Sequence, residues 1–153
     1  MNNKTSISYQ IEQVRKMLEA GKPEQALDYL DRLDSNNHLI QNARGVCLMR
    51  LGQADSAIQI LRDLAFRGQI CIPSDTPPLF AANYATALLM KGYNQEALEI
   101  LADLKPAHHP YIAALYDAIA EWKRGLTLFQ KLCCRLKLYP KKPISLHVYP
   151  GSL

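Results

Sequence analysis

Few side chains in this chain of 153 residues could do chemistry, and their spacing does not bring them together. The chain contains no CxxC, HxxxH or HExxH, the spacings typical of metal sites, and neighbouring cysteines point to different sides of a helix. We therefore expect reduced thiols and neither a metal nor another cofactor. The cysteines and histidines are Cys47, Cys71, Cys133, Cys134, His38, His108, His109 and His147.

Acid–base chemistry has one candidate pair. Asp117 and Glu121 are four residues apart, so they share one face of a helix. A solvated helix face explains this spacing better than paired catalytic carboxylates do. Because the chain also has no GxSxG and no glycine-rich phosphate loop, we expect a protein that is not an enzyme.

The composition indicates one folded domain. Hydrophobic residues make up 48% of the chain, which is typical of globular proteins. The sequence has neither a basic start followed by an apolar run nor a run of about 18 apolar residues. These features predict a cytoplasmic protein.

One pattern occurs three times, beginning at Gly21, Gly52 and Gly92. Alanine follows each glycine after five residues, and leucine after nine and after twelve. Offsets that differ by four and three lie on one helix face, so a helix should follow each glycine. Its predicted buried positions are Ala26, Leu30, Leu33, Ala57, Leu61, Leu64, Ala97, Leu101 and Leu104.

A second apolar stripe at helical spacing precedes each glycine. Each unit is therefore predicted to be a helix, a glycine turn and another helix, because glycine ends a helix at low cost. The stripes are Ile11, Val14, Met17 and Leu18; Leu39, Ala43, Val46 and Met49; and Ala81, Tyr84, Ala85 and Leu88.

These units resemble tetratricopeptide repeats. Besides the alanine after the glycine, each has a small or slender residue seven positions before it (Val14, Gly45 and Ala85). A large one stands four positions before it (Met17, Leu48 and Leu88). The glycines are 52 − 21 = 31 and 92 − 52 = 40 residues apart, against about 34 in the family. The stretch RGQICIPSDTPP predicts a loop insertion between the second and third units.

The resemblance implies an all-α fold, a short α-solenoid of antiparallel helix hairpins. Three units would be followed by a degenerate capping hairpin, whose last helix is predicted at 126–138. Residues 1–138 would form the repeat domain, and residues 139–153 an extended C-terminal tail.

In such a solenoid the first helix of each pair lines a concave groove, and a partner peptide would bind there. Asn side chains can bond both the donors and the acceptors of an extended peptide, and Met adapts to varied side chains. We expect Asn42 and Asn83 to face solvent in the free protein. The candidate groove residues are Asn42, Val46, Met49, Arg50, Leu79, Asn83, Thr86 and Met90. Structural or merely solvated roles for these positions remain the alternative.

The function that follows is a protein–protein interaction scaffold or adaptor. Size and repeat number also resemble the small tetratricopeptide chaperones of bacterial secretion systems. The sequence leaves the identity of the partner and the oligomeric state open.

Basic residues collect at the C-terminal end. Residues 122–153 contain seven Lys or Arg and no acid, whereas residues 1–121 contain 11 Lys or Arg and 14 Asp or Glu. The candidate basic patch is Arg124, Lys131, Arg135, Lys137, Lys141 and Lys142. It predicts, as an alternative function, a peripheral adaptor on an anionic membrane or an acidic partner. We do not expect nucleic acid, because aromatics do not alternate with these cations.

The predicted helix at 126–138 has two interpretations. Its apolar face (Leu128, Phe129, Leu132, Cys133 and Leu136) should cap the repeat domain, or it could meet a membrane or a partner helix. The tail also has two interpretations. Ile144, Leu146 and Val148 could dock on the protein's own helices or on a neighbour's in a dimer, or the tail could be disordered.

Overall fold

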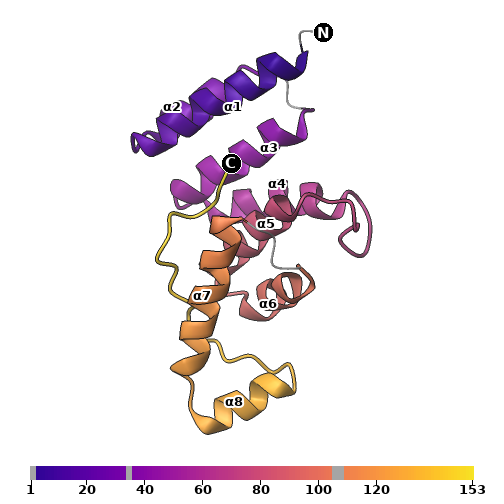
Figure 1. Ribbon diagram of the computed structural model, residues 1–153, viewed down its shortest axis with the longest axis vertical. Helices are drawn as coiled ribbons and strands as arrows, with labels where there is room; N and C mark the ends of the chain where they lie inside the picture. Colours follow the sequence, from indigo (N-terminus) through magenta and orange to yellow (C-terminus); the bar gives the residue numbers. More distant parts are fainter. Residues whose placement is uncertain (1–2, 34–35, 105–108) are drawn as a thin grey trace.

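The computed structural model describes residues 3–33, 36–104 and 109–153, and within these ranges the chain forms eight α-helices and no strand (Figure 1). His108 lies outside the described residues. The helices are α1 Asn3–Glu19, α2 Pro23–Asp31, α3 His38–Arg50, α4 Ala54–Phe66, α5 Pro78–Met90, α6 Asn94–Asp103, α7 Pro110–Arg124 and α8 Leu128–Arg135.

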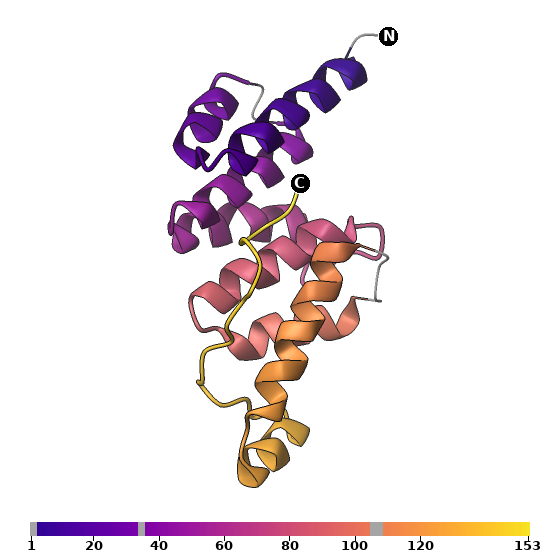
Figure 2. The same cartoon turned by 60° about the vertical axis from the view of Figure 1, so that its left-hand side comes forward.

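The first six helices pack against their neighbours in chain order, so their order along the molecule follows the sequence (Figures 1 and 2). Gly21, Gly52 and Gly92 join the paired helices with φ between +68° and +77°. Side chains are disfavoured in this left-handed region, which explains glycine at all three turns. The predicted order of helix, glycine turn and helix is confirmed. Gly125, at the fourth turn, has φ −78° and is not left-handed.

The small residues of the repeated pattern lie where helices touch. Ala26, Ala57 and Ala97 are all fully buried. A Cβ placed on Gly45 would come within 2.6 Å of the Leu61 side chain, so α3 and α4 are in direct contact there.

Two predictions about buried apolar side chains differ from the structure. Leu39 is 47% exposed, and its neighbour Ile40 is buried in its place. In α8 the whole apolar face is outside the core, so the prediction that it caps the domain is wrong. Trp122, Leu126 and Ile144 bury their side chains at that end of the core instead.

The tail, residues 139–153, runs in an extended path from α8 back along α7 and α5 to α3 (Figure 2). Ile144 is buried, and Leu146 and Val148 are half-buried against the core. The structure therefore has the tail docked on the protein's own helices.

None of the helices described here combines the length and the apolar character needed to cross a bilayer.

The buried alanine of α6 provides a test of the helix contacts. Ala97→Glu places an unpaired carboxylate where no solvent reaches, so we expect the free energy of unfolding to fall by at least about 3 kcal/mol. Urea denaturation would measure this change.

The matched control is Ala102→Glu, the same substitution at an exposed site of α6. We expect it to cost about 1 kcal/mol or less, because only the helix dipole opposes it. Equal stability of the two variants would contradict the packing of α6 at Ala97.

Candidate functional site

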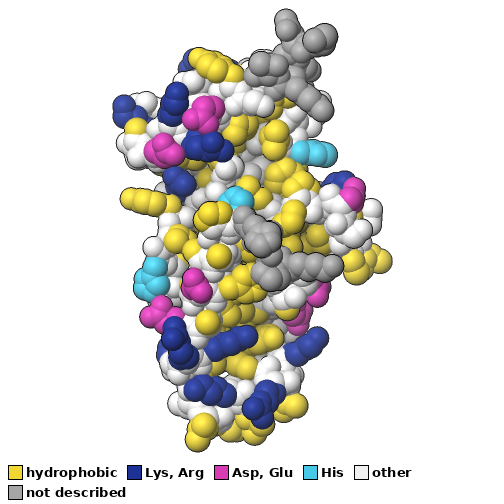
Figure 3. Space-filling model, in the orientation of Figure 1, with side chains coloured by type: hydrophobic (Ala, Val, Ile, Leu, Met, Phe, Trp, Pro, Cys, Tyr) yellow, Lys and Arg dark blue, Asp and Glu magenta, His cyan; other side chains and the backbone are white. Residues whose placement is uncertain are grey.

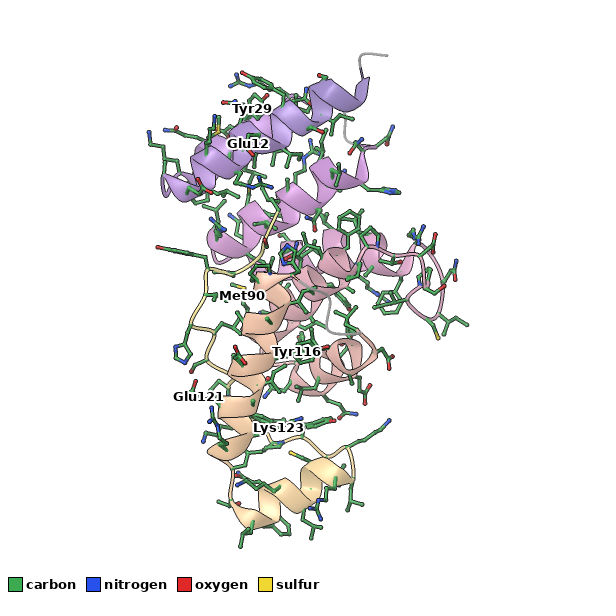
Figure 4. All side chains as sticks on the ribbon, viewed as in Figure 1. Glu12, Tyr29, Met90, Tyr116, Glu121 and Lys123 are labelled. Atoms are coloured by element: carbon green, nitrogen blue, oxygen red, sulfur yellow. The ribbon has the colours of Figure 1, made fainter. Side chains whose placement is uncertain are left out.

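The cysteines and carboxylates that could have done chemistry lie apart. The four thiols are free, and the described residues contain no cluster of three or more side chains able to hold a metal. Asp117 is exposed, whereas Glu121 pairs with His147 of the tail, with 3.2 Å between Oε2 and Nε2. Figure 4 shows Glu121 on the side of α7 where the tail passes. Both carboxylates are therefore exposed on α7, and Glu121 has His147 of the tail as a close partner.

The densest set of polar contacts joins the end of the tail to α3, α5 and α7. At its centre, Asn83 of α5 bonds both backbone groups of Ser152. Asn83 Oδ1 accepts from Ser152 N at 3.0 Å, and Asn83 Nδ2 donates to Ser152 O at 2.8 Å. This pair of bonds resembles the pairing that a neighbouring β-strand would give an extended residue.

A second amide fixes the orientation of the first. Asn83 Nδ2 also donates to Asn42 Oδ1 of α3 at 2.9 Å. Asn83 is fully buried and Asn42 is 3% exposed. The expectation that both face solvent is wrong, because the tail and the neighbouring helix cover them. Asn83 Oδ1, Asn83 Nδ2 and Asn42 Oδ1 instead have hydrogen-bond partners inside the protein, as burial requires.

A tyrosine from α7 holds the residue before Ser152. Tyr111 Oη accepts from Gly151 N at 2.8 Å and lies 2.6 Å from Thr86 Oγ1. Since Thr86 donates its own proton to Ala82 O, Tyr111 donates to Thr86. Burial raises the pKa of Tyr111, although the N–H bond from Gly151 opposes the rise, so the hydroxyl stays neutral and can both donate and accept.

Shape selects glycine at this point of the tail. Gly151 has φ +80°, and a Cβ there would come within 2.7 Å of Met49 Cε and 2.9 Å of Val46 Cγ2. Val46 and Met49 are themselves buried. A larger residue would have to move these core side chains and adopt a strained backbone.

Arg50 binds carbonyl groups from two segments. Its guanidinium donates to Pro150 O at 3.4 Å, to Gly151 O at 3.3 Å and to Leu18 O at 3.2 Å, and it lies 5.5 Å from the centre of the Tyr149 ring. Burial lowers the pKa of Arg50, and these carbonyl groups compensate part of the lost hydration. We call Val46, Met49, Arg50, Asn83 and Tyr111 the tail site.

A separate anchor holds the start of the tail. Asn94 Nδ2 donates to Pro140 O at 3.2 Å and to Lys142 O at 2.8 Å, and Trp122 Nε1 donates to Lys142 O at 2.9 Å. Lys142 Nζ in turn donates to Gly125 O at 3.0 Å. Ile144, two residues after Lys142, is buried and adds apolar contact. We call this set of contacts the proximal anchor.

The structure brings together six of the eight candidate groove residues. Asn83, Arg50, Val46 and Met49 meet the tail directly, and Asn42 and Thr86 support it from beneath. The other two do not join them. Leu79 is half-buried against the core at the start of α5, and Met90 is 37% exposed at its end.

Sequence reasoning missed several residues that hold the tail. Tyr111 and Trp122 belong to the fourth unit, which the repeat pattern treats only as a cap, and Asn94 opens a second helix. The indole N–H of Trp122 was the available signal, because a buried tryptophan normally needs an acceptor. Arg15, which donates to Leu153 O at 3.0 Å, had no such signal.

The candidate basic residues fall into three groups. Arg124, Lys131 and Arg135 line one cavity of about 360 Å³ between α7, α8 and the start of the tail. Lys137 and Lys141 are exposed outside it, and Lys142 belongs to the proximal anchor.

Comparison with known proteins gives no relative for this chain. No protein-family model matches it, and neither the curated proteins nor the solved structures gave a match.

Replacing the buried tail glycine tests the docking. Gly151→Val adds a side chain that meets Met49 and Val46 and disfavours φ +80°, so we expect the tail to leave its site. The amides of Gly151's neighbours should lose protection in hydrogen exchange, while the free energy of unfolding falls by no more than about 3 kcal/mol.

Ser145→Val is the control, because Ser145 lies in the tail and is exposed. It should keep the exchange pattern of the parent. Unchanged protection of Ser152 in Gly151→Val would show that the tail does not depend on the close fit at residue 151.

The buried thiol of α3 predicts a pH effect. Burial raises the pKa of Cys47 from 9.0 to about 12. Between these values the unfolded chain has lost the proton and the folded protein keeps it, so stability falls as pH rises above about 9. We expect Cys47→Ala to weaken this fall between pH 9 and 10 in thermal melts. Cys71→Ala, at an exposed thiol, should leave it unchanged.

Proposed function

We propose that this chain is a cytoplasmic interaction scaffold, built from divergent tetratricopeptide-type hairpins, that binds an extended segment of a partner protein at the tail site. The hairpins would present α3, α5 and α7 as one surface. The function would be recognition without chemistry on the bound segment.

One observation carries this proposal: Asn83 bonds both the N–H and the C=O of a single extended residue, Ser152. An extended peptide has unpaired donors and acceptors along its length, and binding must satisfy both. A buried side-chain amide does so with one residue. The arrangement is therefore a means of holding a peptide backbone, whichever chain supplies it.

The contacts also suggest what kind of segment would fit. Arg50, Asn83 and Tyr111 bond backbone atoms of the tail, so most neighbouring side chains of a ligand would be free to vary. The exception is the position of Gly151, where Val46 and Met49 leave no room. A partner segment should have glycine at that position. Two residues before it, an aromatic side chain should stack on Arg50 as Tyr149 does.

The tail itself would act as an internal competitor. Since it occupies the tail site in this structure, a partner segment must displace it. The partner would then gain the contacts that the tail gives up, and its apparent affinity would be reduced by the fraction of molecules with the site closed.

A synthetic peptide provides the experiment. The probe is a fluorescent peptide with the sequence of residues 143–153, PISLHVYPGSL, added to the full-length Gly151→Val protein. We expect it to bind this variant measurably tighter than the parent, because only the variant has an open site. Fluorescence anisotropy would give both dissociation constants.

Adding Asn83→Ala to the Gly151→Val protein should weaken peptide binding by about 1–3 kcal/mol, since the amide bonds to the ligand are lost. Gln95→Ala, at an exposed glutamine of α6, is the control and should not change the dissociation constant. A melting curve for each variant separates lost binding from lost folding. Failure of the peptide to bind the folded Gly151→Val protein would refute the proposal.

A further inference from the structure

The apolar face of α8 points away from the protein. Cys134, on the opposite side of the helix, is the residue of α8 that packs against the core. At about 100° per residue, Leu128, Leu132 and Leu136 lie on the face away from Cys134. With their neighbours they form what we call the α8 ridge: Leu128 (87% exposed), Phe129 (73%), Leu132 (54%), Leu136 (68%) and Leu138 (61%).

The ridge belongs to a helix with a well-defined start and not to a frayed helix end. A capping box starts α8, in which Thr127 Oγ1 accepts from Gln130 N at 3.2 Å and Gln130 Oε1 accepts from Thr127 N at 3.0 Å. The reciprocal bonds fix where the helix begins and therefore which residues face outward. Five large apolar side chains grouped at one end of a molecule usually mark an interaction surface.

Cations lie beside the ridge. Lys123, Arg124, Lys131 and Arg135 line the cavity of about 360 Å³ between α7, α8 and the tail. Within the ranges that the structure describes, none of the four forms an ion pair. Figure 3 shows dark blue Lys and Arg side chains gathered at this end of the molecule, with yellow apolar side chains beyond them at its tip.

The charge pattern restricts what could cover the ridge. Residues 122–153 contain seven Lys or Arg and no Asp or Glu. A second copy of the chain would bring another unbalanced positive end against this one, which like-charge repulsion opposes. The occupant should be apolar on the inside and negative at its surface.

We propose that the α8 ridge and its cations bind the surface of a bilayer that contains anionic phospholipids. α8 lies at the far end of the molecule (Figure 1), so its leucines can enter a flat surface without a matching groove. The leucines reach the acyl layer while the four cations meet lipid phosphates, the two layers that a basic amphipathic helix uses. Figure 4 places Lys123 on the last turn of α7, close to α8.

This orientation is independent of the proposed peptide binding. The tail site lies on α3, α5 and α7 around Asn83, away from α8 in both ribbon views (Figures 1 and 2). A protein bound to a membrane by the ridge would leave that site open to water. The two proposals can therefore succeed or fail separately.

Vesicle co-sedimentation tests the membrane proposal with the full chain. The vesicles are phosphatidylcholine alone and phosphatidylcholine mixed with phosphatidylserine. We expect the parent to sediment with the mixed vesicles only, and less so as salt rises. Lys131→Glu with Arg135→Glu should lower the partition coefficient by roughly fivefold or more for each cation lost. Phe129→Glu with Leu132→Glu should abolish sedimentation.

Two matched controls make the result specific. Ile70→Glu changes an apolar residue that is 96% exposed but lies in the loop between α4 and α5. Lys16→Glu with Lys22→Glu reverses two exposed charges at the opposite end of the chain. Both variants should bind like the parent, and circular dichroism should show all variants folded.

Three outcomes would overturn the proposal. The first is no sedimentation of the folded parent with the mixed vesicles. The second is equal loss in the control variants, because binding would then reflect net charge alone. The third is parent binding to soluble polyglutamate but not to the vesicles, which would assign the surface to an acidic protein.

Discussion

Close approach of paired helices at small side chains is the constraint on which the other contacts depend. Ala26, Ala57 and Ala97 are fully buried, and Gly45 leaves no space for a methyl group beside Leu61. These positions let each hairpin close tightly and let the next one stack on it at a fixed distance. The spacing brings Asn42 of α3 within 2.9 Å of Asn83 of α5. Larger side chains at the alanine positions would separate the helices that carry the amides.

Two buried amides and a tyrosine then make an extended segment part of a helical protein. A lone extended stretch cannot bond its own backbone, and no neighbouring strand is present among the described residues. Asn83 and Tyr111 supply the missing partners from side chains. The polar groups are therefore satisfied at both ends of each bond, which is the condition for burying them without a large loss of stability.

Repeat spacing predicted the helices and most of their buried faces, because the alanine and leucine pattern recurs in three copies. The resemblance to tetratricopeptide repeats implied one groove that contains Asn42 and Asn83, together with three residues that contact the tail. It could not predict the environment of these asparagines, since the residue that covers Asn83 stands 69 positions later in the chain. The predicted orientation of α8 was wrong for a similar reason. Periodicity identified its apolar face, but Trp122, Leu126 and Ile144 already fill the space that this face was expected to cover.

The proximal anchor gives the tail a second attachment. Asn94 and Trp122 hold Lys142 at one point, Asn83 and Tyr111 hold Gly151 and Ser152 at another, and the backbone between them is a short tether. If Gly151 and Ser152 dissociate while the proximal anchor stays bound, they remain near the tail site at an effective concentration on the order of millimolar. A free ligand present at micromolar levels would lose to it unless its intrinsic affinity were about a thousandfold higher. The protein would thus ignore look-alike segments that bind weakly at low concentration and respond only to a ligand that binds tightly or is itself tethered nearby.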